Sequence, residues 1–324
     1  MFNITENRSY RFTGYVSLYL LLTLCCAIEI AAEESWHPSK YGETDRLGAI
    51  NNLSPLLVKK AAALIESGTV YSLAMNTGPD TPAFGYRNYQ LLTKQIPDAD
   101  NNQAGPANNV TGFDDLLISW LGIGTQIDGF GHVAIDGLHY NGVPVAEVFH
   151  PHGSPVYGIH HLPPIVTRGI LLDMAGLMDM EMLDAGTVFN EPELKSAMDR
   201  QKVTVMAGDV VLLHTGWMAT TERDPENSLR TTPGLGVQGA EYLASQGVVA
   251  IGSDTWALEV LPPENPQELF PVHGALLVKH GVYILENIRT GQLAEDQAYE
   301  FFFMLAAPKF VGALQSSVHP VAIR

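Results

Sequence analysis

The sequence predicts a mixed α/β fold in which a mixed β-sheet or barrel-like core is flanked by helices. Strand-like and short helix-like segments alternate along the chain, but without the regular period of repeated strand–helix–strand units. The chain has 324 residues, of which 46% are hydrophobic, so it can bury a large core. Neither an internal repeat nor a glycine-rich phosphate loop is present, which argues against repeat proteins and the common nucleotide-binding folds.

The first 32 residues have the pattern of a signal peptide. Two arginines precede the apolar run 15–27, and Ala31 and Ala32 follow it. We expect removal of this segment, a single domain over residues 33–324, and a secreted or periplasmic location. An uncleaved amino-terminal membrane anchor is the alternative.

Composition narrows the chemistry that the chain can perform. Cys25 and Cys26 are the only cysteines and lie inside the apolar run, so a processed chain has no thiol for disulfides, zinc binding or nucleophilic catalysis. The formal charge of −17 comes from 35 acidic and 18 basic residues. With no basic cluster, we expect neither nucleic acid nor a membrane surface beyond the signal segment as a partner. The remaining chemistry belongs to His, Asp, Glu, Ser or a metal bound through nitrogen and oxygen.

Turn and cap signals divide the chain into elements. Ser54 and Pro55 predict the N-cap and first turn of a helix that continues to about Ser67. The segment 76–110 is rich in Pro, Gly, Asn and Asp and predicts a long loop or lid. The other predicted elements are strands over 69–75, 116–127, 169–174, 209–215, 248–252 and 282–285, helices over 191–201, 236–246 and 269–279, and one or two strands over 301–322.

The segment 119–142 organises the predicted site. Within it Gln126, Asp128 and His132 have even spacings, so in an extended strand they share one face. A straight strand would separate Gln126 from His132 by about 20 Å, too far for one ion, but two glycines after Asp128 let the backbone bend. A carboxamide, a carboxylate and an imidazole at the end of an apolar strand predict half of a metal site. The alternative is a polar hairpin end with a hydrogen-bonded histidine.

Two residues later in the sequence are candidates for the other half of the metal site. His273 lies where a loop becomes a helix, and Glu286 ends an apolar strand. A strand-end carboxylate is held by the scaffold while remaining accessible. On position alone, each residue has an alternative to a role in the site. Glu286 could be an exposed strand-end acid, and His273 could be a helix-terminal histidine bonded to the backbone.

A histidine-rich segment lies in the proline-rich loop 139–164. It contains His150, His152, His160 and His161. Because four histidines on a loop rarely converge without a rigid scaffold, we favour solvated or hydrogen-bonded side chains over a second metal site. A serine hydrolase is not indicated, since the chain contains no G-x-S-x-G elbow.

The order of these segments resembles the metal-dependent cyclase family, which includes bacterial kynurenine formamidase, isatin hydrolase and a trans-dienelactone hydrolase. Residues 122–132, GIGTQIDGFGH, align with the family signature H-x-G-T-H-x-D-x-P-x-H, with matches at Gly124, Thr125, Asp128 and His132. The later segments GDVVLLHTGW, GSDT and VHGALLVKHGVYILENI are also similar to the family. The similarity extends from about Tyr41 to the end and implies a swivelling β/β/α fold.

The signature also shows departures. Gly122 and Gln126 replace two histidines that are ligands in the family, and Phe130 replaces the proline. Gln126 can still offer a neutral carbonyl oxygen, which suits harder ions such as manganese. The resemblance implies that Gln126, Asp128, His132 and Glu286 hold a divalent metal, zinc or manganese, and that His273 is the acid/base residue.

The activity that the resemblance implies is hydrolysis of an amide or lactone bond in a small molecule, as in kynurenine formamidase, by metal-bound hydroxide. Cyclic substrates of the isatin or dienelactone type are an alternative, as is a non-catalytic binding protein on the same scaffold. Trp120, Phe130 and Trp217 are candidates for an aromatic substrate pocket, although large aromatics in strands mostly belong to the core. We also expect a homo-oligomer, because family members commonly assemble.

Overall fold

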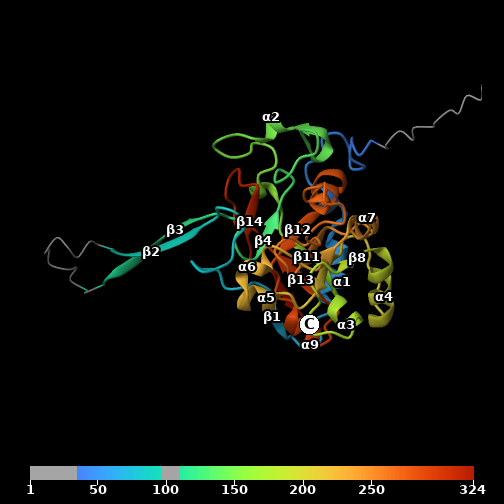
Figure 1. Ribbon diagram of the computed structural model, residues 1–324. Helices are drawn as coiled ribbons and strands as arrows, with labels where there is room; N and C mark the ends of the chain where they lie inside the picture. The colour runs from blue at the N-terminus through green and yellow to red at the C-terminus, as the bar shows by residue number, and fades with distance from the viewer. Residues whose placement is uncertain (1–34, 97–107, 109) are drawn as a thin grey trace, which may run out of the picture. The chain divides into compact units, whose positions relative to one another are not determined.

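A curled nine-stranded mixed sheet forms the centre of the fold in Figure 1, a computed structural model that describes residues 35–96, 108 and 110–324. The predicted signal peptide lies outside the described residues, and its cleavage stays a prediction. The strand order is β1-β15-β13-β7-β9-β11-β12-β4-β14, and residues Trp36 to Arg324 form one unit. Within the described residues, no helix is long and apolar enough to span a bilayer.

Four parallel strands make up the middle of this sheet. They are β7 (Ile165–Asp173), β9 (Val210–His214), β11 (Ala250–Ser253) and β12 (Tyr283–Glu286). Their sequences are nearly continuous apolar runs, as expected for parallel strands that are covered on both faces. These four strands agree with predicted segments.

Antiparallel strands complete both sides. Next to β12 lie β4 (Gln126–Asp128) and β14 (Gln315–Ser317), whereas β13 (Glu300–Leu305), β15 (Val321–Ile323) and β1 (Val70–Ser72) follow β7. The smaller pairs are β5 (Leu138–His139) with β6 (Val143–Pro144) and β8 (Val188–Phe189) with β10 (Gly234–Leu235). A mixed sheet with flanking helices confirms the predicted fold class.

The longer helices begin where their caps predict, but α1 (Pro55–Ala62) ends before the predicted end at about Ser67. In α1, the Ser54 side chain accepts a hydrogen bond from the Leu57 amide. In α4 (Glu191–Gln201), Asn190 and Glu193 form a capping box, and α4 has the predicted bounds. The remaining helices are α2 (Val145–Val148), α3 (Met174–Leu177), α5 (Met218–Arg223), α6 (Pro225–Ser228), α7 (Val237–Ser245), α8 (Pro271–His273), a π-helix (Gly274–His280) and α9 (Gly291–Glu295).

Two predictions about the first third of the chain were wrong. The segment predicted as a loop contains β2 (Tyr89–Ile96), which pairs with β3 (Gly112–Ser119) in a long hairpin. The turn-forming residues that suggested a loop flank these strands, so the average composition hid them. The predicted strand over 116–127 is instead the end of β3 and the start of β4, because Gly124 adopts a left-handed conformation between them.

Near the carboxyl terminus the predicted one or two long strands are three short ones, β13, β14 and β15. Pro308 and Pro320 lie between them and cannot donate to a sheet ladder. The predicted helix over 269–279 is one turn of α8 followed by the π-helix, which Gly281 ends in a left-handed conformation.

Candidate metal centre

Strand pairing brings the two halves of the predicted site together. β4 lies antiparallel to β12, with Gln126 opposite Glu286 and Asp128 opposite Ile284. Side chains that are opposite each other in a ladder lie on the same face, and so do residues two apart in one strand. Gln126, Asp128 and Glu286 therefore project to one face, although 158 residues separate Asp128 from Glu286 in the sequence (286 − 128).

Asp128, Glu286 and His273 form a compact set of potential metal ligands. The Nε2 atom of His273 lies 3.3 Å from Glu286 Oε1 and 3.8 Å from Asp128 Oδ2. One ligand atom from each residue lies within 4.8 Å of the others, and all three residues are buried. Asp128 Oδ2 has no hydrogen-bond partner, an unusual state for a buried carboxylate oxygen. Two carboxylates and one imidazole with an unsatisfied oxygen fit a divalent cation.

Gln126 bridges the two carboxylates. Its Nε2 atom donates to Asp128 Oδ1 over 3.1 Å and to Glu286 Oε2 over 2.7 Å. Gln126 thus touches both acids of the ligand set, and its role as a metal ligand stays a prediction. In this orientation the amide offers its donors to the acids, and a rotation of the amide would present Oε1 to an ion.

Glu259 fixes the orientation of the His273 ring. Glu259 Oε1 lies 2.5 Å from His273 Nδ1, and the backbone amides of Val272 and His273 donate to the same carboxylate over 3.3 and 3.2 Å. A carboxylate behind a ligating imidazole selects the tautomer and aims the other nitrogen, here Nε2, at the ion. Glu259 was missed by sequence reasoning. Its only signal is an acid inside the apolar run 256–261.

The electrostatics follow from this arrangement. Burial lowers the pKa of His273, but hydrogen bonds to Glu259 and Glu286 and the charges of both acids outweigh it and raise the pKa to about 10. For Glu286, burial and the charge of Asp128 raise the pKa to about 7 against the opposing effect of His273. Without an ion, His273 and Glu286 therefore tend to hold protons, and binding of an ion would displace these protons.

His132 lies beside the ligand set and not in it. Its ring centroid is 6.3 Å from that of His273, and its side chain lines a cavity of about 710 Å³. Burial lowers the pKa of His132, against the opposing charge of Asp128. The sequence assigned a metal-ligand role to His132 and an acid/base role to His273. The structure instead brings His273 into the ligand set and leaves His132 facing the cavity.

Only one of the three predicted pocket aromatics lines this cavity. Trp120 lies there with Arg87, Gln315 and His132. Phe130 is buried in the core against Tyr140 and Tyr283, with ring centroids 4.7 and 4.3 Å apart.

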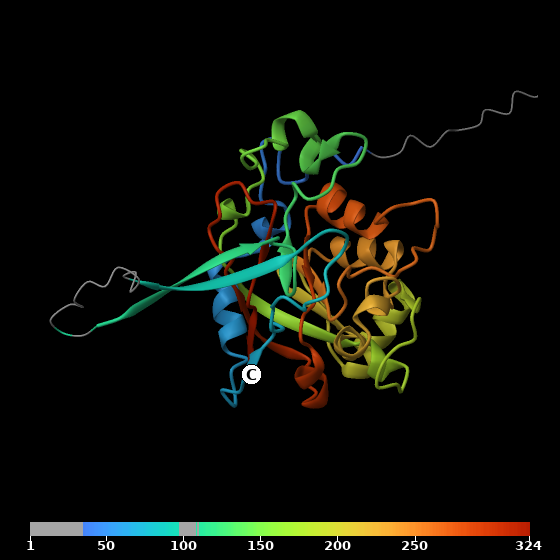
Figure 2. The same cartoon turned by 60° about the vertical axis from the view of Figure 1, so that its left-hand side comes forward.

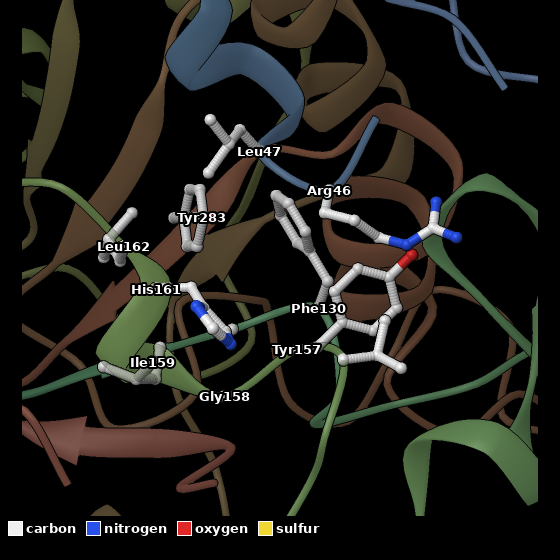
Figure 3. A pocket seen from close by; sticks show the side chains of 11 residues that line it. Arg46, Leu47, Phe130, Tyr157, Gly158, Ile159, His161, Leu162 and Tyr283 are labelled. Atoms are coloured by element: carbon white, nitrogen blue, oxygen red, sulfur yellow. The ribbon is translucent and has the colours of Figure 1, made fainter. Parts of the chain in front are cut away.

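Figure 3 shows Phe130 with Tyr157 and Tyr283 around a separate cavity of about 20 Å³, which is too small for a substrate. Trp217 is 3% exposed at the start of α5. Phe130 and Trp217 are therefore buried side chains that do not line the cavity of Trp120 and His132.

Gly122 makes room for Gln315. A Cβ atom at Gly122 would lie 1.9 Å from Gln315 Nε2 and 2.8 Å from Arg87 Nη1. Gln315 is opposite Asp128 in the β14–β4 ladder, so its side chain shares the face of the site. Gln315 Oε1 is buried without a hydrogen-bond partner. The space beside Gly122 is thus filled by an amide from the last third of the chain.

The histidine-rich loop does not join this site. The rings of His160 and His161 lie 3.9 Å apart, and His160 Nδ1 accepts a hydrogen bond from the Gly312 amide over 3.1 Å. His150 and His152 are exposed, and none of the four belongs to the ligand set of Asp128, His273 and Glu286. These placements favour the hydrogen-bonded and solvated interpretation.

Comparisons with known proteins show the family and the fold of this chain. Residues 71–260 match the model of the Cyclase family, whose description is "Putative cyclase". A crystal structure described as a novel cyclase is 30% identical, with a TM-score of 0.79 over 88% of this chain and 98% of its own. A search of curated proteins found no match.

Two isatin hydrolases share the fold at lower identity. Isatin hydrolase A from Ralstonia solanacearum is 16% identical, with a TM-score of 0.58 over 84% of this chain and 98% of its own. An isatin hydrolase bound to the product analogue thioisatinate is 18% identical, with a TM-score of 0.55 over 84% and 97%. At these identities the likeness is one of fold.

Proposed function

Because the chain belongs to the Cyclase family, we propose that it is a metal-dependent hydrolase of amide or lactone bonds in small molecules. The observation that carries this proposal is the convergence of Asp128, His273 and Glu286, with one unsatisfied carboxylate oxygen, beside a large cavity. Two structures that share the fold are isatin hydrolases, so a cyclic amide is one substrate class to test beside an open-chain formamide.

Asp128, Glu286 and His273 would hold the ion, zinc or manganese, since the set consists of nitrogen and oxygen donors. A bound divalent ion supplies Lewis acidity toward a carbonyl oxygen and acidifies water at neutral pH. The two carboxylates offset its charge. Glu259 holds the His273 ring with Nε2 toward the acids, so the site is organised before an ion arrives.

His132 is the proposed proton carrier. It lines the cavity, and its ring lies close to the ligand set without belonging to it. An imidazole at that place can take a proton from the attacking water and deliver it to the leaving nitrogen or oxygen. Trp120 and Arg87 line the same cavity, so the substrate would lie against an aromatic face and near a cation.

A second candidate function is non-catalytic binding of a small molecule. The observation that favours it is the Gln126 amide, whose Nε2 donates hydrogen bonds to both Asp128 and Glu286. The Gln126 amide does not supply a hydrogen bond to every oxygen of the two carboxylates, because Asp128 Oδ2 remains without a partner.

Metal analysis combined with hydrolysis assays separates the two functions. The purified chain is assayed with isatin, N-formylkynurenine and a dienelactone side by side, before and after chelation. We expect about one bound ion per chain and hydrolysis that chelation abolishes and zinc or manganese restores. A metal-free chain that binds these compounds without cleaving them would support the binding protein.

A further inference from the structure

The base of the β2–β3 hairpin forms one wall of the large cavity beside the candidate metal centre. β2 and β3 pair with each other in a two-stranded sheet and extend away from the nine-stranded sheet in both views (Figures 1 and 2). Arg87 precedes β2, Trp120 directly follows β3, and the Trp120 amide donates to the Asn88 carbonyl over 3.2 Å. The hairpin thus brings a guanidinium and an indole to the cavity of about 710 Å³ that His132 also lines.

Arg87 gives this wall a positive charge. Among the described residues that line the cavity, Arg87 is the one permanently charged side chain, because none of the others is an aspartate, a glutamate or a lysine. The chain as a whole is acidic, with a formal charge of −17. The positive wall is therefore a local feature, and it fits an anionic ligand.

The guanidinium of Arg87 is held in place and still has donors for a ligand. Its Nη1 atom donates to the Gly122 carbonyl over 2.7 Å, which fixes the position of the group. Within residues 35–96, 108 and 110–324, no carboxylate forms an ion pair with Arg87. A guanidinium carries several N–H donors in a planar fork, so the contact with Gly122 leaves others to bind an anion.

A second polar group with unmet hydrogen-bonding capacity lies next to Arg87. The absence of a side chain at Gly122 leaves room for both groups, since a Cβ atom there would lie 1.9 Å from Gln315 Nε2 and 2.8 Å from Arg87 Nη1. Gln315 Oε1 is buried and has no partner. A buried amide oxygen without a partner is a place where a hydrogen bond from a ligand stabilises the complex.

A carboxylate on a flat ring matches these groups. Its single negative charge balances one guanidinium, and its two oxygens match the fork of N–H donors. A phosphate monoester would instead bring about two negative charges to a wall with one cation. The Trp120 side chain is 44% exposed and packs edge-on against Tyr86, with ring centroids 5.0 Å apart. Its indole can therefore lie against a flat ligand.

We propose that Arg87 binds a carboxylate group of the substrate, with the Gln315 amide beside it. The amide or lactone that this chain cleaves then belongs to a flat molecule that carries a carboxylate away from the bond that is broken. For the reaction the proposal rests on the proposed function, but the preference for a carboxylate is a property of binding and is measurable without turnover.

Equilibrium binding of two indoles tests the proposal. Indole-2-carboxylate and indole-2-carboxamide have the same ring and nearly the same shape, and they differ by one negative charge. Isothermal titration of the purified full chain, with the metal that it carries, gives both affinities. We expect the wild-type chain to bind the carboxylate at least tenfold more tightly than the carboxamide, because a hydrogen bond to a charged group is stronger than one to a neutral group.

Substitution of Arg87 shows where the carboxylate binds. Arg87→Gln can still donate to the Gly122 carbonyl, so it should lose about 10- to 100-fold in affinity for the carboxylate and keep its affinity for the carboxamide. Arg87→Lys keeps the charge, should retain part of the preference, and replaces the glutamine variant if that variant does not fold. Arg223→Gln removes an exposed arginine of α5 outside the cavity and should bind both compounds as the wild type does.

Three results would overturn the proposal. A preference for the carboxylate that persists in Arg87→Gln would place the anion elsewhere, for example at the ion. An equal loss of both affinities would mean that Arg87 only supports the backbone at Gly122. The third is a wild-type chain that does not bind the carboxylate at about 1 mM. A chain that has the expected preference but hydrolyses nothing would refute the proposed hydrolase and leave the carboxylate site standing.

Discussion

His273 Nδ1 lies 2.5 Å from Glu259 Oε1, and this contact determines what the other ring nitrogen can do. With Nδ1 engaged, Nε2 points at Asp128 and Glu286 over 3.8 and 3.3 Å. The contact between the last residue of α8 and an acid 14 residues earlier in the chain thereby makes a helix-terminal histidine the third member of the candidate ligand set.

The first prediction concerns Glu259. Glu259→Gln should leave the three ligand residues in place but weaken metal binding about 10- to 100-fold, as is typical when the residue behind a ligating histidine is changed. Isothermal titration with zinc or manganese measures the effect. Glu268→Gln, which alters an exposed acid nearby in the sequence, is the control. Equal affinities for all three proteins would show that Glu259 has no part in orienting His273.

The two carboxylates provide the second prediction. Asp128→Asn and Glu286→Gln each remove one negative charge from the ligand set while keeping side-chain volume, so each should lower bound metal and hydrolysis together. Metal content by mass spectrometry and turnover are measured on the same samples. Full occupancy in both variants would place the ion elsewhere.

His132 is the subject of the third prediction. His132→Ala should keep the bound ion and reduce kcat by roughly 10²- to 10⁴-fold, the usual cost of losing acid/base catalysis. His152→Ala, a change in the exposed histidine loop, should leave kcat unaltered. If His132→Ala loses its metal instead, His132 is a ligand, as the sequence alone suggested.

The pH dependence of metal binding follows from the protons that the site holds. In the absence of an ion, the pKa of His273 is about 10, whereas that of Glu286 is about 7. At pH 8 His273 is therefore still protonated and Glu286 is mostly ionised, so binding of one ion should release about one proton. Affinity should rise as pH increases toward 10. Calorimetry at pH 8 in buffers of different ionisation enthalpy measures the proton count, and a count of zero would contradict this arrangement.

The Gly122–Gln315 contact leads to the last prediction. Gly122→Ala places a methyl group where Gln315 Nε2 lies, and the flexible amide must move toward the cavity. Because only a side-chain end moves, stability should change by less than about 1 kcal/mol, while KM rises. In a Gln315→Ala background the same substitution should affect KM less, because only the contact with Arg87 then remains. An equal effect in both backgrounds would show that Gln315 does not transmit it.

Much of the sheet could be predicted because buried parallel strands have a simple signature. Runs such as Val210–Leu213 are continuously apolar, and the caps of α4 are local in sequence. The β2–β3 hairpin could not be recognised because its strands lie between segments rich in turn residues. Its apolar residues also occur in adjacent pairs instead of alternating.

The residues of the candidate ligand set were visible in the sequence, but the placement of the two histidines was not. Spacing placed Asp128 and His132 on one strand face, yet β4 ends at Asp128 and the chain turns before His132. The direction of the His273 ring depends on Glu259, which lies 14 residues earlier on another segment. Such an orientation arises from tertiary packing and leaves no periodic trace in the sequence.

Metal stoichiometry in three proteins tests the central claim most directly. Elemental analysis should find about one zinc or manganese ion per wild-type chain, the same in His132→Ala, and almost none in His273→Ala. A His273→Ala protein that retains its full complement of metal, or a wild-type chain that hydrolyses substrate without any, would contradict the account.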